Sequence, residues 1–138
     1  MPQITTEPDH AVLSASGAHR WALCAGSRKA EEGLPDTTSP AAAEGTVAHE
    51  LASLTLNHGD HCLDHYADQE MADFVRKYTD YCRQISKGAD TLIEHRVDFS
   101  DHVPGGFGTA DFISINDGTA HIVDLKYGFN RVYAKNNL

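Results

Sequence analysis

The sequence has few cysteines, and they form no recognisable pattern. The three are Cys24, Cys62 and Cys82, which are odd in number, widely spaced and without a C-x-x-C pair. A disulfide framework needs an even set of cysteines at regular spacings. The cysteine content therefore argues against a disulfide-rich secreted domain and favours a reducing compartment.

Long apolar runs are also missing. The longest are far too short to span a bilayer, and residues 1–9 have neither the basic segment nor the apolar segment of a signal peptide. We therefore expect no membrane segment and a cytoplasmic location, in a cell or in an infected host.

Basic residues are scarce. The chain has 11 lysines and arginines against 20 aspartates and glutamates, a net charge of −9 with histidine neutral. This balance excludes a protein that binds nucleic acid through a broad basic surface. It does not exclude a nuclease, because a site built of carboxylates is itself negative and meets phosphate through its metal.

The length of 138 residues and the hydrophobic content of 41% predict one globular domain. We expect a disordered start over residues 1–13 and a folded domain over 14–138. Ser14 and Ser16 are candidate N-caps for a short helix that carries Trp21. No internal repeat or low-complexity tract interrupts the chain.

Hydrophobic periodicity predicts two longer helices, over residues 41–57 and 67–86. In the first, Val47, Leu51 and Leu54 form the expected inward stripe, and Gly45 indicates a close backbone approach. The inward residues expected in the second are Met71, Phe74, Val75, Tyr78, Tyr81, Cys82 and Ile85. Residues 90–99 alternate as a strand, and residues 131–138 resemble the opening of a helix.

A β-hairpin is the strongest local prediction. Two apolar runs, residues 107–115 and 119–126, flank Asn116-Asp117-Gly118. Asp-Gly is typical of a two-residue type I′ turn, whose central residues need positive φ. With Asn116 opposite Thr119, counting back along both strands puts Asp111 opposite Asp124 and Thr109 opposite Lys126.

This register would place two carboxylates about 5 Å apart on one face of the sheet. Ile113, Ile115 and Ile122 share that face, and Phe112, Val123 and Leu125 fill the other. A sheet that is apolar on both faces is covered on both, and two buried like charges are costly unless a cation joins them. The pattern therefore predicts Mg²⁺ or Mn²⁺ between Asp111 and Asp124. The alternative is a solvent-facing hairpin with scattered charges.

These motifs resemble the PD-(D/E)XK nuclease superfamily, and within it the RecB-like and lambda-exonuclease-like branch. The second-strand carboxylate of that family matches Asp111 in Gly108-Thr-Ala-Asp111, and its (D/E)-x-K motif matches Asp124-Leu125-Lys126. The Gly-x-x-x-His motif of RecB-like members matches Gly45-Thr-Val-Ala-His49. Residues 14–27 are similar to the start of a phage-associated branch of these nucleases.

The resemblance implies an α/β (α+β) fold with a restriction-endonuclease-like αβββα core, a small mixed sheet flanked by helices. The family's Gln-x-x-x-Tyr motif would begin near Leu138. We therefore expect the chain to be the N-terminal part of a longer protein, ending before the last helix and strand. Some relatives bind an iron–sulfur cluster, which needs four thiolates, and the positions of Cys62 and Cys82 do not suit one.

The resemblance also assigns roles to residues. His49, Asp111, Asp124 and the main-chain carbonyl of Leu125 would bind Mg²⁺ or Mn²⁺, and Lys126 would act with the two aspartates in catalysis. The residues expected to contact substrate are Arg20, Tyr127 and Arg131. The simpler alternatives are that His49 lies on the surface of its helix and that Lys126 is an ordinary surface lysine. Glu94 either reaches the site or pairs with Arg96, and we expect the pairing with Arg96, which would keep it out of the site.

The function implied is metal-dependent, exonuclease-like hydrolysis of DNA in phage or prophage recombination, with DNA and a phage recombination protein as partners. One alternative is a catalytically silent nuclease-fold module that binds DNA or a partner. Another is an α/β domain of a different fold that binds Ca²⁺ at the hairpin aspartates. The last alternative predicts no activity that depends on Lys126.

Overall fold

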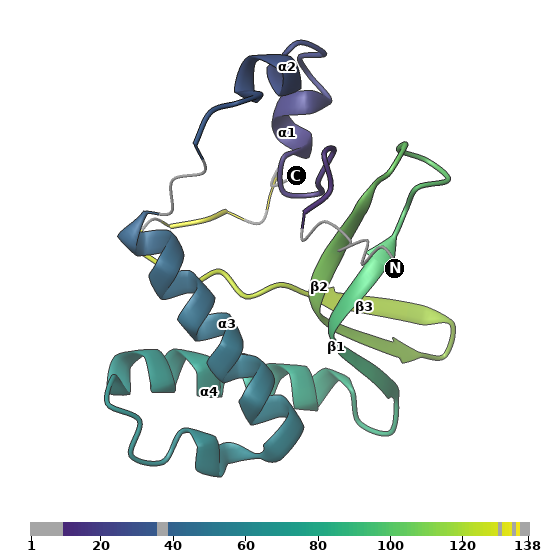
Figure 1. The fold of residues 1–138 in the computed structure, drawn as a ribbon. Helices are drawn as coiled ribbons and strands as arrows, with labels where there is room; N and C mark the ends of the chain where they lie inside the picture. Colours follow the sequence, from purple (N-terminus) through teal and green to yellow (C-terminus); the bar gives the residue numbers. More distant parts are fainter. Residues whose placement is uncertain (1–9, 36–38, 130, 134, 136–138) are drawn as a thin grey trace, which may run out of the picture. The chain divides into compact units, whose positions relative to one another are not determined.

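The computed structural model describes residues 10–35, 39–129, 131–133 and 135 (Figure 1). The elements in chain order are α1 (Ala18–Trp21), α2 (Ser27–Glu31), α3 (Pro40–His58), the 3₁₀ turn η1 (Asp60–Cys62), α4 (Gln69–Ile85), β1 (Asp90–Asp98), β2 (Phe107–Asn116) and β3 (Thr119–Val123). The chain is thus a mixed α/β protein with helices and one small sheet. Within the described ranges, no helix is both long enough and apolar enough to cross a membrane.

The described chain divides into two compact units, residues 10–35 with 96–109 and residues 39–95 with 110–135. In the first unit, the Trp21 indole donates to the carbonyl of Ser14 at 2.8 Å. Helix α1 begins after Gly17, and neither predicted serine caps it. The side-chain oxygen of Ser14 instead accepts a hydrogen bond from the N–H of Gly17, the residue before the helix, at 3.2 Å. Ser14 therefore stabilises the turn that leads into α1.

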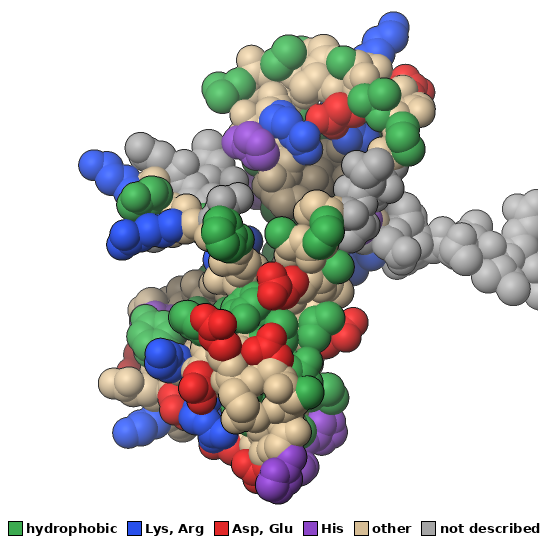
Figure 2. Space-filling model, turned by 90° about the vertical axis from the view of Figure 1, so that its left-hand side faces the viewer, with side chains coloured by type: hydrophobic (Ala, Val, Ile, Leu, Met, Phe, Trp, Pro, Cys, Tyr) green, Lys and Arg blue, Asp and Glu red, His purple; other side chains and the backbone are tan. Residues whose placement is uncertain are grey.

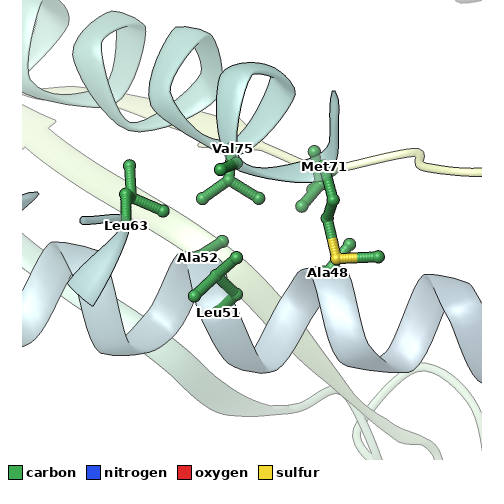
Figure 3. Close-up of a cluster of buried hydrophobic side chains, with 8 residues drawn as sticks. Ala48, Leu51, Ala52, Leu63, Met71 and Val75 are labelled. Carbon is green, nitrogen blue, oxygen red and sulfur yellow. The ribbon is translucent and has the colours of Figure 1, made fainter. Parts of the chain in front are cut away.

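The core of the second unit lies between α3 and α4 (Figure 3). Its buried members are Ala48, Leu51 and Ala52 of α3, Met71, Ala72 and Val75 of α4, and Leu63 and Leu125. Alanines on the facing side of α3 let the two helices approach closely. Burying this apolar area is the main force that holds the helices together.

The predicted extents of α3 and α4 are confirmed to within a few residues, but their predicted inward faces are partly wrong. Val47 and Leu54 are 41% and 49% exposed, while Ala48, Ala52 and Thr55 are buried beside Leu51. In α4, the same holds for Phe74 and Tyr81, which are 48% and 53% exposed. Small residues carry little hydrophobic signal, so the pattern of large residues predicts the wrong inward face.

The hairpin is confirmed in its turn and its register. Asp117 and Gly118 have φ of 47° and 74°, and Asn116 pairs with Thr119 and Ile113 with Ile122. The strand order is β1-β2-β3 and the sheet is antiparallel, whereas the prediction was a mixed sheet. Strands joined in succession by short connections run antiparallel, which explains the difference.

The sheet is covered on both faces only at the middle of β2. Phe112, Ile113 and Ser114 are buried, whereas Ile115 and Ile122 near the turn are 48% and 69% exposed. The prediction that all of these apolar residues are covered is therefore wrong at the turn end of the hairpin. The covered part of β2 directly follows Asp111.

The ladder between β2 and β3 is shorter than predicted. It starts at Phe112 paired with Val123, so the predicted ladder pairs of Asp111 with Asp124 and of Thr109 with Lys126 are wrong. The segment after β3 leaves the sheet and runs beside α3 (Figure 1). It leaves because the side chain of Leu125 is drawn into the helical core.

Two further contacts hold this segment in place. Tyr78 of α4 donates its hydroxyl to the carbonyl of Val123 at 3.4 Å. The predicted close approach at Gly45 is confirmed, because a Cβ at this position would lie 3.4 Å from the carbonyl oxygen of Tyr127. Of the helix predicted over 131–138, residues 131–133 are not helical, and 134 and 136–138 lie outside the described residues. Residues 1–9 of the predicted disordered start also lie outside them.

Candidate metal site

Three side chains of the second unit meet where α3 passes the sheet. His49 comes from α3, Glu94 from β1 and Asp111 from β2, and one ligand atom of each lies within 4.8 Å of the others. Two of the predicted ligands, His49 and Asp111, are thus brought together. Glu94, which we expected to stay out of the site, joins them.

The local structure explains how each side chain reaches the cluster. His49 follows buried Ala48, so it lies at the edge of the face that α3 buries. Asp111 precedes buried Phe112, and its side chain is only 12% exposed. Burial of a carboxylate to this degree requires partners that compensate its charge.

Glu94 reaches the cluster through an unusual backbone conformation. Its φ is +48°, in the left-handed region that residues with a Cβ rarely adopt. In the middle of a strand this costs about 1–2 kcal/mol relative to an extended residue. Strain of this kind is concentrated at functional sites, where the surrounding structure holds it.

Both oxygens of Asp111 are engaged. Oδ1 lies 3.2 Å from Nδ1 of His49, and Oδ2 accepts a hydrogen bond from the main-chain N–H of Leu125 at 2.7 Å. The carboxylate therefore orients the imidazole and also fixes the chain just beyond β3. The resemblance implied a role for the Leu125 carbonyl, whereas in the structure the neighbouring N–H of the same residue contacts Asp111.

Asp124 and Lys126 form a pair beside this cluster. Lys126 Nζ lies 2.8 Å from Oδ2 of Asp124, and both side chains are about half exposed. Asp124 is outside the three-residue cluster, so the predicted pair of opposed aspartates is split. Its negative charge nevertheless acts on His49, since it contributes to raising the pKa of that imidazole.

The electrostatics of the cluster favour a bound cation. The hydrogen bond to Asp111 raises the pKa of His49. Burial lowers this pKa, and the negative charges of Asp111, Glu94 and Asp124 raise it further. Burial, followed by the negative charge of Asp111, raises the pKa of Glu94. In the metal-free protein a proton on His49 therefore offsets part of the negative charge, and a metal would replace it.

We expect the pKa of His49 to lie above about 6.5 in the metal-free protein and to fall in Asp111→Asn. Because the folded pKa is raised, the stability that protonated His49 contributes is full below about pH 6.5 and is lost as the pH rises through the folded pKa. An NMR titration of the His49 ring, with urea unfolding across the same pH range, measures both. An unchanged His49 pKa in Asp111→Asn would contradict the assignment, and Asp117→Asn in the hairpin turn is the control.

The structure gives the other predicted site residues different surroundings. Arg20 pairs with Glu31 at 3.0 Å within the first unit. The guanidinium of Arg131 lies 5.4 Å from the ring centroid of Tyr133. Tyr127 packs edge-on against Phe74, with ring centroids 5.8 Å apart. Of these three residues, only Tyr127 lies in the segment that directly follows Asp124 and Lys126.

One imidazole and two carboxylates suit a divalent cation, since carboxylates favour Mg²⁺, Ca²⁺ or Mn²⁺ and an imidazole favours a transition metal. Mg²⁺ also accepts carboxylate oxygens, but it favours sites with fewer nitrogen ligands. The residues present therefore fit a single divalent cation.

The fold and the cluster together define a mixed α/β protein with a candidate divalent-metal site. Residues 10–138 match the family described as "Protein of unknown function (DUF2800)", and the chain belongs to this family. A comparison with solved structures finds no match.

Proposed function

We propose that this protein is a metal-dependent nuclease of the PD-(D/E)XK type that hydrolyses phosphodiester bonds in DNA. The observation that carries the proposal is the cluster of His49, Glu94 and Asp111, with the ion pair of Asp124 and Lys126 directly after β3. The succession of helices followed by three antiparallel strands also agrees with the αβββ part of that fold.

His49, Glu94 and Asp111 would hold Mn²⁺ or Mg²⁺, with Asp124 contributing negative charge nearby. A bound divalent cation supplies a Lewis acid for a phosphate oxygen and lowers the pKa of a bound water. Without a cation, three carboxylates in one region repel a phosphate. DNA binding at this site should therefore depend on metal.

The protein's own groups have separate tasks in this proposal. Asp111 orients the His49 ring and, through Leu125, fixes the position of the residues on either side. The ammonium group of Lys126 is accessible and held by Asp124, so it can donate hydrogen bonds to a phosphate. Such a donor stabilises the negative charge that develops in the transition state.

The test is hydrolysis of DNA by the wild-type protein with Mn²⁺, with Mg²⁺ and with EDTA. We expect cleavage with either metal and none with EDTA. End-labelled linear duplex and closed circular DNA are compared, because an exonuclease of the phage recombination type degrades only the linear substrate. Binding of metal and DNA without cleavage would instead identify a catalytically silent module, and binding of neither would refute the proposal.

A further inference from the structure

The second unit has a pocket that includes Lys126, the residue paired with Asp124. It lies among the start of α3, the start of α4 and the segment after β3, and encloses about 330 Å³. Its side-chain lining comes from Glu44, Glu70, Phe74, Lys126, Tyr127 and Phe129. This volume is at the lower end of the range for small-ligand sites and suits one planar ring system.

The apolar part of the lining consists of aromatic rings that remain accessible. Phe74 meets Tyr127 edge-on, with an interplanar angle of 75°. Phe74 is 48% exposed and Phe129 is 97% exposed, so neither ring is used mainly to fill the core. Accessible aromatic rings in a pocket are typical of sites where unpaired nucleobases stack.

The polar part of the lining combines acceptors with one cation. Glu44 and Glu70 line the pocket together with Tyr127. Burial, followed by the negative charges of Asp68, Glu44 and Glu70, raises the pKa of the Tyr127 hydroxyl. A carboxylate accepts hydrogen bonds from the exocyclic amino group of a base such as cytosine, and it repels phosphate. Figure 2 shows apolar, acidic and basic side chains lying next to one another on the face that it draws.

Lys126 connects this pocket to the proposed reaction. It lines the pocket and also contacts Asp124 at 2.8 Å. A nucleotide whose phosphate meets Lys126 could therefore place its base among the aromatic rings.

We infer that this pocket binds an unpaired nucleobase that carries an exocyclic amino group, next to the phosphate that Lys126 contacts. The inference rests on the proposed nuclease function, and it specifies the substrate as single-stranded DNA or a frayed duplex end. A stacked and paired base has its faces covered and its amino group already hydrogen-bonded, so intact duplex ends must first open. Thymine lacks the amino group and should bind less well than cytosine.

The test measures binding of fluorescein-labelled dC12 and dT12 by anisotropy, with Ca²⁺ as the divalent cation. The variant is Phe129→Ala, which removes an almost fully exposed ring and leaves the core intact. The control is Tyr81→Ala, which removes an exposed ring from α4 outside the pocket. We expect the wild type to prefer dC12, and Phe129→Ala to bind dC12 about 5- to 100-fold more weakly while the control is unchanged.

Equal binding of dC12 by the wild type and Phe129→Ala would overturn the inference, as would equal binding of dC12 and dT12 by the wild type. Cleavage of linear DNA with Mn²⁺, measured in parallel, separates the two proposals. Loss of dC12 affinity in Phe129→Ala without cleavage by the wild type would support the pocket and refute the nuclease. Cleavage by the wild type, with the dC12 affinity of Phe129→Ala unchanged, would support the nuclease and refute the pocket.

Discussion

Replacement of Asp111 by asparagine should lower Mn²⁺ affinity by at least about 100-fold and abolish DNA cleavage. Loss of a group that only orients a metal ligand typically costs 10- to 100-fold in affinity, and Asp111 is proposed both to bind the metal and to orient His49. Asparagine keeps the size of the side chain and one acceptor oxygen for the N–H of Leu125. Isothermal titration with Mn²⁺ and a gel assay with linear DNA measure the two effects.

The matched control is Asp117→Asn in the turn of the same hairpin, where asparagine also tolerates a φ of 47°. This control removes the same charge and should leave metal binding and cleavage unchanged. Thermal unfolding of the metal-free proteins shows whether Asp111→Asn is folded. A folded Asp111→Asn that binds Mn²⁺ like the wild type would show that the cluster is not the metal site.

Replacement of Lys126 by methionine should reduce kcat about 100- to 1000-fold and leave Mn²⁺ affinity within a few-fold of the wild type. Removing one preorganised donor to a developing oxyanion has an effect of this size in other enzymes. Methionine keeps the length and the apolar stem of the side chain without its charge. Single-turnover cleavage and titration with Mn²⁺ separate the chemical step from metal binding.

Lys87→Met is the control, since Lys87 is an exposed lysine in the turn after α4. It should cleave DNA at the wild-type rate. If Lys126→Met and Lys87→Met both cleave at that rate, the lysine has no part in the reaction. That result would favour an α/β domain of another kind, in which the acidic cluster binds a cation for structural reasons.

The hairpin could be predicted from the sequence because its determinants are local. Asp117-Gly118 sets the turn, and counting from it gives the correct partner for every paired residue up to Val123. The lengths of α3 and α4 also follow from local signals, with Ser39 and Asp68 accepting hydrogen bonds at their starts. Two of the three residues of the cluster, His49 and Asp111, follow from motifs at the correct spacing.

The rest of the site depends on contacts between segments far apart in the chain. Asp124 leaves the ladder because Leu125 packs against α3 and α4, which counting along a hairpin cannot reveal. Glu94 joins the cluster through a left-handed backbone that breaks the alternation of β1. The one signal in the sequence was an acidic residue in the middle of an otherwise regular strand, and such residues are also common on exposed strands.

The left-handed backbone at Glu94 lowers stability at a position where the side chain serves the proposed metal site. Glycine would adopt this conformation without strain, and asparagine would tolerate it better than glutamate does. Neither residue can add a second carboxylate beside Asp111. Selection for stability alone would favour replacing Glu94, so a family that keeps an acidic residue at this position is selected for what the cluster does. Variation at this residue among relatives should therefore follow the presence of His49 and Asp111 and be independent of the packing of β1.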